Sequence, residues 1–415
     1  MQISKNKTMK RGTSWLKILF CIGAIAFAIL LLTTSCQQKD TDPAAKYKEI
    51  IAEIKKEYAP DRRDKTFDVT VEEKDGQWVV SGSTTEAAAL DALKERLEQA
   101  DKKAVAEVRM LPDTAQLGDR TWGVATLSST SLRYGANYSA EMATQVPMGT
   151  PLRVLEKRSY WYRVITPEGY TAWTTTTGVS RMNETEFEAW KATDKVMVTA
   201  DFVQVLEQPK ADAATVSDAI LGNILAVDHQ SRGQYIAVHL PDGRQGWILR
   251  SATVPFDKWL DSRNPTEANI LTTAFHFNGY PYLWGGTTTK AVDCSGFTKT
   301  VYFLNGIILR RDASQQAKTG TEIEVTDNFE NLRPGDLLFF GRKATAEKKE
   351  SITHVGIYMG DQRFIHSASR VKINSLNPEA EDYYDGSKNL VRVRRILGNQ
   401  DQETGITSIK NHPWY

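Results

Sequence analysis

The stretch "AVDCSGFTKTVYFLNG", residues 291–306, places a cysteine at the start of a helix-forming segment. Asp293 can cap the helix that follows, so Cys294 would lie in its first turn. The residues that would share one face of this helix are apolar: Phe297, Val301 and Leu304. The pattern therefore predicts a thiol at a helix N-terminus that packs against a core.

Cys294 is open to two interpretations, a small buried hydrophobe or a nucleophile. A nucleophile needs a stabilised thiolate, and both the positive end of a helix and a nearby imidazole supply that stabilisation. We therefore expect the pKa of a catalytic Cys294 to be lowered. The imidazole has to come from another part of the chain.

Two of the six histidines are placed to act together, His354 and His366. They lie on the strand-like segments 353–360 and 363–369, which a Gly360-Asp361 turn would join into a hairpin. Alternation along the first strand puts His354 on the face opposite Val355. The pattern predicts His354 as a general base and His366 as the group that orients it. A strand-end structural histidine and a Cys/His/His metal site are the alternatives, but the wide spacing is not typical of metal ligands.

Length and charge limit the possible classes of protein. A chain of 415 residues predicts two to four domains. The 52 basic and 51 acidic residues nearly balance, so the sequence predicts no nucleic-acid partner. Nothing in it indicates an oligomeric state.

The N-terminus, residues 1–36, has the pattern of an export signal. Five basic residues precede the apolar run 18–32, which is short for a bilayer-spanning helix; a retained membrane anchor is the alternative. "LLTTSC" resembles a bacterial lipoprotein signal, although Thr33 stands where leucine is usual. The resemblance implies lipidation of Cys36 and attachment to a membrane, at the periplasmic or cell-surface face of a bacterial envelope.

An internal repeat about 75 residues apart organises the middle of the chain. "WYRVITPEGYTAW", residues 161–173, and "YIAVHLPDGRQGW", residues 235–247, share a strand, a Gly-containing turn and a second strand. The pattern predicts two small β-barrels, at 118–182 and 195–253, joined by a helical connector. They resemble bacterial SH3-like domains.

The parts on either side of the repeat mix helices and strands. Residues 46–112 predict a small α+β domain with a hairpin turn at Asp75-Gly76, and no reactive group was found in it. A polar boundary at 254–266 precedes an α+β domain at 262–397. The final residues, 399–415, are mostly polar and predict no role.

Four motifs between residues 265 and 397 are similar to the successive signatures of the NlpC/P60 family of cysteine peptidases. They are "YLWGGTTTKAVDCSGFTKTVY", "LRPGDLLFFG", "THVGIYMGD" and "RFIHSAS". The resemblance implies a papain-like α+β catalytic domain in which Cys294 is the nucleophile, His354 the base and His366 the orienting residue. It also implies that the Tyr282 hydroxyl approaches the oxyanion, and it implies no cofactor and no metal.

Two SH3-like domains ahead of the catalytic domain resemble a narrower branch, the γ-D-glutamyl-L-diamino acid endopeptidases, also called dipeptidyl-peptidase VI. This branch acts on short peptidoglycan peptides with a free N-terminal L-alanine, whose ammonium is held partly by the first SH3-like domain. The resemblance implies these substrate-binding residues: Glu141, Tyr170, Trp284, Asp293 and Ser295. Two alternatives stay open, a broader endopeptidase or amidase of intact wall and a non-catalytic wall-binding lipoprotein.

Overall fold

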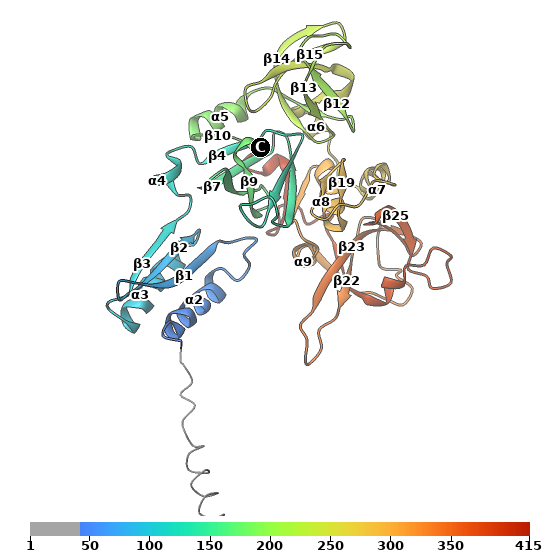
Figure 1. The fold of residues 1–415 in the computed structure, drawn as a ribbon. Helices are drawn as coiled ribbons and strands as arrows, with labels where there is room; N and C mark the ends of the chain where they lie inside the picture. Colours follow the sequence, from blue (N-terminus) through green and yellow to red (C-terminus); the bar gives the residue numbers. More distant parts are fainter. Residues whose placement is uncertain (1–41) are drawn as a thin grey trace, which may run out of the picture.

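The computed structural model describes residues 42–415, and Figure 1 shows four parts that follow one another along the chain. The predicted signal segment and Cys36 lie outside the described residues. Within 42–415, no helix is long and apolar enough to cross a bilayer.

The first part is an α+β module with a three-stranded sheet in the order β1-β2-β3. The predicted hairpin turn is confirmed at Asp75-Gly76, where both φ angles are positive, 51° and 76°. The helices bury Tyr47, Ile54 and Leu93 against the sheet. The elements are α2 (Ala45–Tyr58), β1 (Phe67–Lys74), β2 (Gln77–Thr84), α3 (Ala87–Ala100) and β3 (Val105–Met110).

The two predicted barrels are each a seven-stranded sheet with its own apolar core. In the first, after α4 (Thr114–Leu117), the strand order is β10-β4-β7-β8-β9-β5-β6. The repeat is confirmed, because the β8–β9 turn at Gly169 and the β15–β16 turn at Gly243 have φ angles of 83° and 88°. The strands of the first barrel are β4 (Trp122–Ala125), β5 (Ser129–Arg133), β6 (Met142–Pro147), β7 (Pro151–Arg158), β8 (Trp161–Ile165), β9 (Thr171–Thr175) and β10 (Val179–Met182).

The connector between the barrels is helical as predicted, α5 (Glu184–Ala192), and begins with a capping box between Asn183 and Glu186. The second barrel has the strand order β13-β12-β16-β15-β14-β11-β17. Its strands are β11 (Lys195–Val198), β12 (Val203–Leu206), β13 (Thr215–Ala219), β14 (Ile224–Arg232), β15 (Tyr235–His239), β16 (Gln245–Leu249) and β17 (Thr253–Pro255).

The last part is the predicted α+β domain, built on a six-stranded sheet in the order β21-β26-β22-β23-β24-β25. One face of this sheet packs on α8, which buries Phe297 and Val301, and a second apolar cluster around Phe364 covers the other face. The polar boundary at 254–266 contains a short helix, α6, that was not predicted. The helices are α6 (Phe256–Asp261), α7 (Glu267–His276), α8 (Cys294–Leu304) and α9 (Ala313–Gln316). The strands are β18 (Thr287–Thr288), β19 (Ala291–Val292), β20 (Ile307–Leu309), β21 (Thr321–Ile323), β22 (Leu337–Arg342), β23 (Ser351–Gly360), β24 (Arg363–Ala368), β25 (Arg370–Ser375), β26 (Leu390–Arg395) and β27 (Ile406–Ser408).

The hairpin β23–β24 turns one position later than predicted. Gly360 pairs with Arg363, so Asp361 and Gln362 are the central residues, with φ angles of 50° and 57°. Alternation along β23 is as expected, because Val355 packs toward α8 and Tyr358 packs into the cluster on the other face.

The segment 399–415, whose sequence was uninformative, is part of the fold. Strand β27 pairs with β20, so the domain extends beyond residue 397. Trp414 stacks edge-on against Trp122 of the first barrel, 5.3 Å between ring centroids. The polar composition concealed these contacts because only a few apolar side chains make them.

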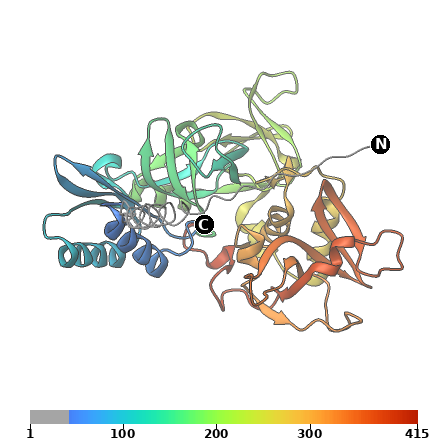
Figure 2. The same ribbon diagram turned by 60° about the horizontal axis from the view of Figure 1, so that its bottom comes forward.

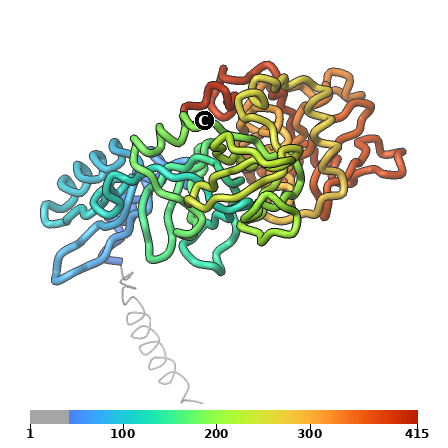
Figure 3. The backbone as a smooth tube through the Cα atoms, turned by 90° about the horizontal axis from the view of Figure 1, so that it is seen from above, coloured from blue at the N-terminus to red at the C-terminus, as the bar shows by residue number. Residues whose placement is uncertain are grey.

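The first barrel lies between the N-terminal module and the α+β domain, as Figures 2 and 3 show from two directions. The segment between α2 and β1 extends from the module toward this junction (Figure 1). In that segment, Arg63 contacts both neighbours: its carbonyl accepts from Thr171 N at 2.7 Å, and its guanidinium pairs with Asp312 at 2.8 Å.

Candidate active site

Cys294 is the first residue of α8, as predicted, and its side chain is buried to all but 8%. The Asp293 carboxylate caps the helix by accepting from Gly296 N at 2.7 Å. Gly296 has no substitute here, because a Cβ would lie 1.9 Å from the carbonyl oxygen of Gly286. The local sequence thus fixes the thiol at a crowded helix start.

Asp293 has no free hydrogen-bonding capacity for a substrate. Its Oδ2 accepts from Arg311 Nη2 at 2.6 Å and from Gly285 N at 2.9 Å. Ser295 Oγ is 3.3 Å from Asp293 Oδ1 and accepts from Arg311 Nη1 at 3.0 Å. Asp293, Ser295 and Arg311 are all buried. Asp293 and Ser295, expected to contact substrate, line the cavity beside Cys294, and their polar groups also form an internal network that holds the start of α8.

The pKa of the Cys294 thiol is raised to about 12, which reverses the expected direction. Burial is the main cause and the negative charge of Asp293 adds to it, while the Val355 backbone N–H opposes both. The positive end of the helix alone would stabilise a thiolate. Here the negative charge of the capping Asp293 carboxylate lies at the same helix end and disfavours a second negative charge on the sulfur. The thiol rests protonated and needs a base when it reacts.

His354 and His366 meet across the β23–β24 hairpin, with His354 Nε2 2.6 Å from His366 Nδ1. His366 Nε2 lies 2.9 Å from Asn374 Oδ1, and Asn374 Nδ2 donates to the carbonyl of Asp382 at 2.7 Å. That last bond fixes the Asn374 amide, so His366 must donate from Nε2 and accept at Nδ1. His354 then donates from Nε2, which leaves its Nδ1 unprotonated and able to accept a proton.

Burial lowers the pKa of both histidines, to about 3 for His354 and about 4 for His366. The charges of His366 and Lys372 lower the pKa of His354 further. Both imidazoles are therefore neutral near neutral pH, as a general base has to be. The strand that carries His354 faces the thiol, because Val355, the next residue, donates its backbone N–H toward the sulfur.

A cavity of about 370 Å³ opens beside Cys294 and is lined by three parts of the chain. The α+β domain contributes Tyr282 and Trp284 from the segment before α8, the first barrel contributes Tyr134, and the N-terminal module contributes Arg63. Burial raises the pKa of Tyr282, so its hydroxyl stays protonated and can donate. Trp284 Nε1 donates to Glu141 Oε1 at 2.7 Å, which joins two of the predicted substrate-binding residues.

A chain of hydroxyl groups ends at Asp312, a residue that the sequence did not single out. Tyr170 donates to Asp312 Oδ2 at 3.1 Å, and the hydroxyls of Tyr134 and Tyr170 are 2.7 Å apart. Tyr170 is buried, which raises its pKa and keeps its proton. Asp312 precedes α9, and its capping pattern with Gln315 was the available signal, but that pattern predicts only a helix start.

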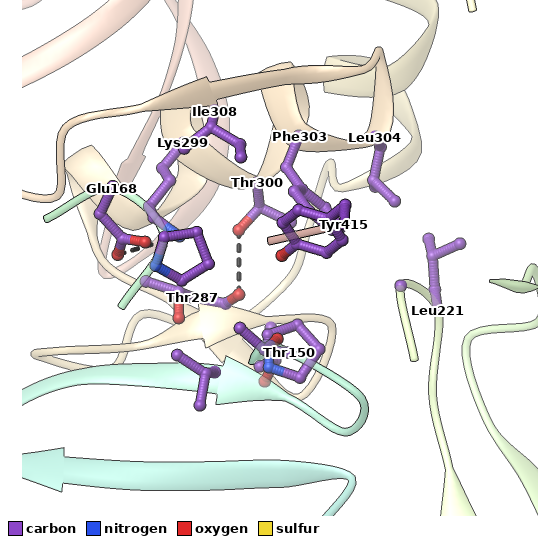
Figure 4. Close-up of a pocket in the computed structure, with 15 residues that line it drawn as sticks. Thr150, Glu168, Leu221, Thr287, Lys299, Thr300, Phe303, Leu304, Ile308 and Tyr415 are labelled. Atoms are coloured by element: carbon purple, nitrogen blue, oxygen red, sulfur yellow. Dashed lines mark hydrogen bonds and ion pairs between the residues drawn. The ribbon is translucent and has the colours of Figure 1, made fainter. Parts of the chain in front are cut away.

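Figure 4 shows a second cavity, at the junction of the two barrels and α8. Its volume is about 30 Å³, and Lys299 Nζ pairs with Glu168 Oε1 there at 3.3 Å. Neither a thiol nor an imidazole lines it. Among residues 42–415, no three His, Cys, Asp or Glu side chains gather to hold a metal ion. The cavity beside Cys294 is therefore the candidate active site.

Comparison with known proteins agrees with this location. The NlpC/P60 family model matches residues 279–395, and a bacterial SH3 domain model matches residues 128–179. A gamma-D-glutamyl-L-lysine dipeptidyl-peptidase of Bacillus cereus is 30% identical over 266 residues, 60% of this chain and 75% of the relative. Dipeptidyl-peptidase 6 of Lysinibacillus sphaericus is 28% identical over 58% of this chain and 86% of the relative.

Among solved structures, an NlpC/P60 family protein from Bacillus cereus is similar with a TM-score of 0.56 and 23% identity. The similarity covers 66% of this chain and 99% of the solved chain. At that identity the similarity shows the shared fold alone.

Proposed function

Since the chain belongs to the NlpC/P60 family of peptidases, we propose that it hydrolyses the γ-D-glutamyl-diamino acid bond of short peptidoglycan peptides with a free N-terminal L-alanine. The observation that carries the proposal is the cavity that the α+β domain, the first barrel and the N-terminal module line together. The thiol of Cys294 borders one part of it, and Tyr134 and Asp312, which the buried Tyr170 hydroxyl connects, border another. A carboxylate with hydroxyl neighbours is suited to a primary ammonium, whose charge needs such partners when it leaves water.

The proposed reaction begins with proton transfer from Cys294 Sγ to His354 Nδ1 while sulfur attacks the γ-carbonyl carbon of D-glutamate. The Ser295 backbone N–H and the Tyr282 hydroxyl stabilise the negative oxygen that forms. His354 then gives its proton to the leaving amine, and the carbon–nitrogen bond breaks to leave a thioester. His354 then takes a proton from water while the oxygen attacks the thioester carbon. The carbon–sulfur bond breaks, His354 returns the proton to sulfur, and the dipeptide L-Ala-γ-D-Glu is released.

Glu141 and Trp284 form a rim in this proposal. Their hydrogen bond joins the first barrel to the segment before α8, and Trp284 lines the cavity there. A glycan-linked alanine would have to pass this rim with no ammonium to offer to Asp312. The enclosed geometry therefore favours short soluble peptides over intact wall.

The test compares L-Ala-γ-D-Glu-diamino acid with its N-acetylated form, with products identified by mass spectrometry. We expect release of L-Ala-γ-D-Glu from the free peptide and at least a tenfold lower kcat/KM for the acetylated one. Equal cleavage of both would favour the broader endopeptidase. Cleavage of neither, with binding to wall material, would favour the non-catalytic protein.

We also propose that the chain is exported and lipid-anchored at Cys36. The basic start, the apolar run 18–32 and "LLTTSC" support this proposal. Metabolic labelling with a radioactive fatty acid should mark the wild-type protein and not Cys36→Ser. Equal labelling of both would contradict the assignment.

A further inference from the structure

The N-terminal module reaches the candidate active site through Arg63, and the adjacent Arg62 contacts Tyr134, another residue that lines the cavity. Both arginines lie outside the regions matched by family models. Arg63 lines the cavity that contains Cys294. We propose that these two arginines form the back wall of the subsite for the substrate ammonium, so that the module helps to set substrate specificity. This inference rests on the function proposed above.

Arg63 joins the two halves of the subsite. Its backbone carbonyl accepts from Thr171 N at 2.7 Å, and Thr171 follows Tyr170 in the chain. Its Nη1 donates to Asp312 Oδ2 at 2.8 Å and to Ser314 Oγ at 2.9 Å. One residue thus fixes both the start of β9, directly after Tyr170, and the carboxylate that Tyr170 contacts.

Arg63 acts by positioning and not by binding substrate. Its Nε and Nη2 donate to Asp61, so with the two Nη1 bonds most of its five N–H groups are used within the protein. Its side chain is 22% exposed. Asp312 Oδ2 accepts from Arg63 and Tyr170, and its Oδ1 lies 3.9 Å from Arg311 Nη1, so a bound ammonium would share Oδ1 with that guanidinium.

Arg62 supports the other end of the hydroxyl chain. Its guanidinium carbon lies 4.8 Å from the centre of the Tyr134 ring, within the range of a cation–π contact. Tyr134 is the residue whose hydroxyl meets that of Tyr170. The two arginines therefore contact the Asp312 carboxylate, the Tyr134 ring and Thr171, the residue after Tyr170.

The experiment measures kcat and KM of full-length Arg63→Ala, Arg63→Lys and Arg62→Ala on the free and N-acetylated tripeptides. We expect Arg63→Ala to raise KM for the free peptide about tenfold with a small change in kcat, since a charged hydrogen bond is lost. The kcat/KM ratio between free and acetylated peptide should fall with it. Arg63→Lys should recover part of the loss, and Arg62→Ala should show a smaller rise in KM.

Asp68→Asn is the matched control, because Asp68 pairs with Arg163 in another contact between the module and the first barrel. If Asp68→Asn raises KM as much as Arg63→Ala, simple docking of the module explains the effect and the proposal is overturned. An unchanged KM in Arg63→Ala also overturns it, provided that the wild type prefers the free peptide. A wild type without that preference refutes the proposed function first.

Discussion

The two barrels share an architecture and a sequence repeat, but only the first contributes side chains to the cavity beside Cys294. Alignment of the repeats puts Tyr170 of the first barrel opposite Arg244 of the second. Tyr170 contacts Asp312, whereas Arg244 pairs with Asp242 in its own turn, Nε to Oδ2 at 2.8 Å. The same turn therefore supplies a hydrogen bond to Asp312, which lines the cavity, in one copy and a local ion pair in the other.

The second barrel braces the first. Asn223 Nδ2 donates to the carbonyl of Ser128 at 2.9 Å, and Asp218 pairs with Lys290 of the α+β domain at 2.8 Å. The two barrels therefore show that both copies of a repeated module can keep the same fold while only one lines the cavity. The other copy supports it through contacts between the barrels.

The largest loss of activity should come from a substitution in the α+β domain, and the losses expected from substitutions in the two barrels are measured against it. Cys294→Ala removes the proposed nucleophile, so we expect kcat on the free tripeptide to fall by roughly 10⁴-fold or more. The cavity stays lined as before, so binding of uncleaved tripeptide, measured by calorimetry, should persist. Full hydrolysis by this variant would remove Cys294 from the mechanism.

The paired substitutions Tyr170→Phe and Arg244→Ala test the comparison directly. Tyr170→Phe loses the hydroxyl that donates to Asp312, and a hydrogen bond to a charged group corresponds to roughly 10- to 100-fold in kcat/KM. Arg244→Ala breaks only its local pair, and we expect kcat/KM within about twofold of wild type. Similar losses in the two variants would show that the barrels are not functionally different.

A substitution within the α+β domain should affect kcat and not KM, which separates orientation of the base from binding by the first barrel. Asn374→Ala removes the acceptor that fixes the His366 tautomer, and we expect kcat to fall about tenfold. Asn374→Asp keeps an oxygen for His366 and should retain more activity. A rise in KM alone would contradict the proposed role of Asn374.

The pH dependence of the free energy of unfolding should be set mainly by two histidines of the α+β domain. Unfolded His354 and His366 titrate near 6.5, whereas burial lowers their folded pKa to about 3 and about 4. Below about pH 6.5 the unfolded chain binds more protons, so the free energy of unfolding should fall by about 1.4 kcal/mol per pH unit for each histidine.

Denaturant titrations between about pH 7 and pH 4.5 measure this loss. His412, near the first barrel, also has a lowered pKa because of burial, so His412→Gln serves as the control. Most of the slope should remain in that variant. A stability that does not change over this range would contradict the buried neutral state of the two histidines.

The smallest effect on activity should come from the brace between the barrels. Asn223 is fully buried, and Asn223→Ala leaves the Ser128 carbonyl and the Ile220 N–H without partners. We expect a loss of about 1–3 kcal/mol in the free energy of unfolding, measured in urea, with KM within about twofold of wild type. A large rise in KM would show that the second barrel also shapes the cavity.

Local patterns predicted much of the fold, because helix caps and strand alternation depend on neighbouring residues. The start of α8 at Cys294, the Asp75-Gly76 turn and the barrel repeat are examples. The pairing of His354 and His366 was also accessible, since the two residues share one hairpin.

What the sequence missed depends on contacts between distant segments. Asp312 acquires its partners from Tyr170 and Arg63, 142 and 249 residues away. The raised pKa of Cys294 reflects burial together with the charge of Asp293, and the degree of burial is a property of the whole fold. Strand β27 was missed because three residues carry too little pattern.

The first barrel lines the cavity beside Cys294, and under the proposed function this has a consequence for the cell. A hydrolase that is kept beside a polymer containing its substrate bond usually needs an inhibitor or a cleavable leader to protect that polymer. Under the proposed function, the first barrel beside the cavity would itself give the protection, by keeping long wall strands from the sulfur. Such a protein can be kept permanently active, and its output is then governed by how fast other hydrolases release small fragments.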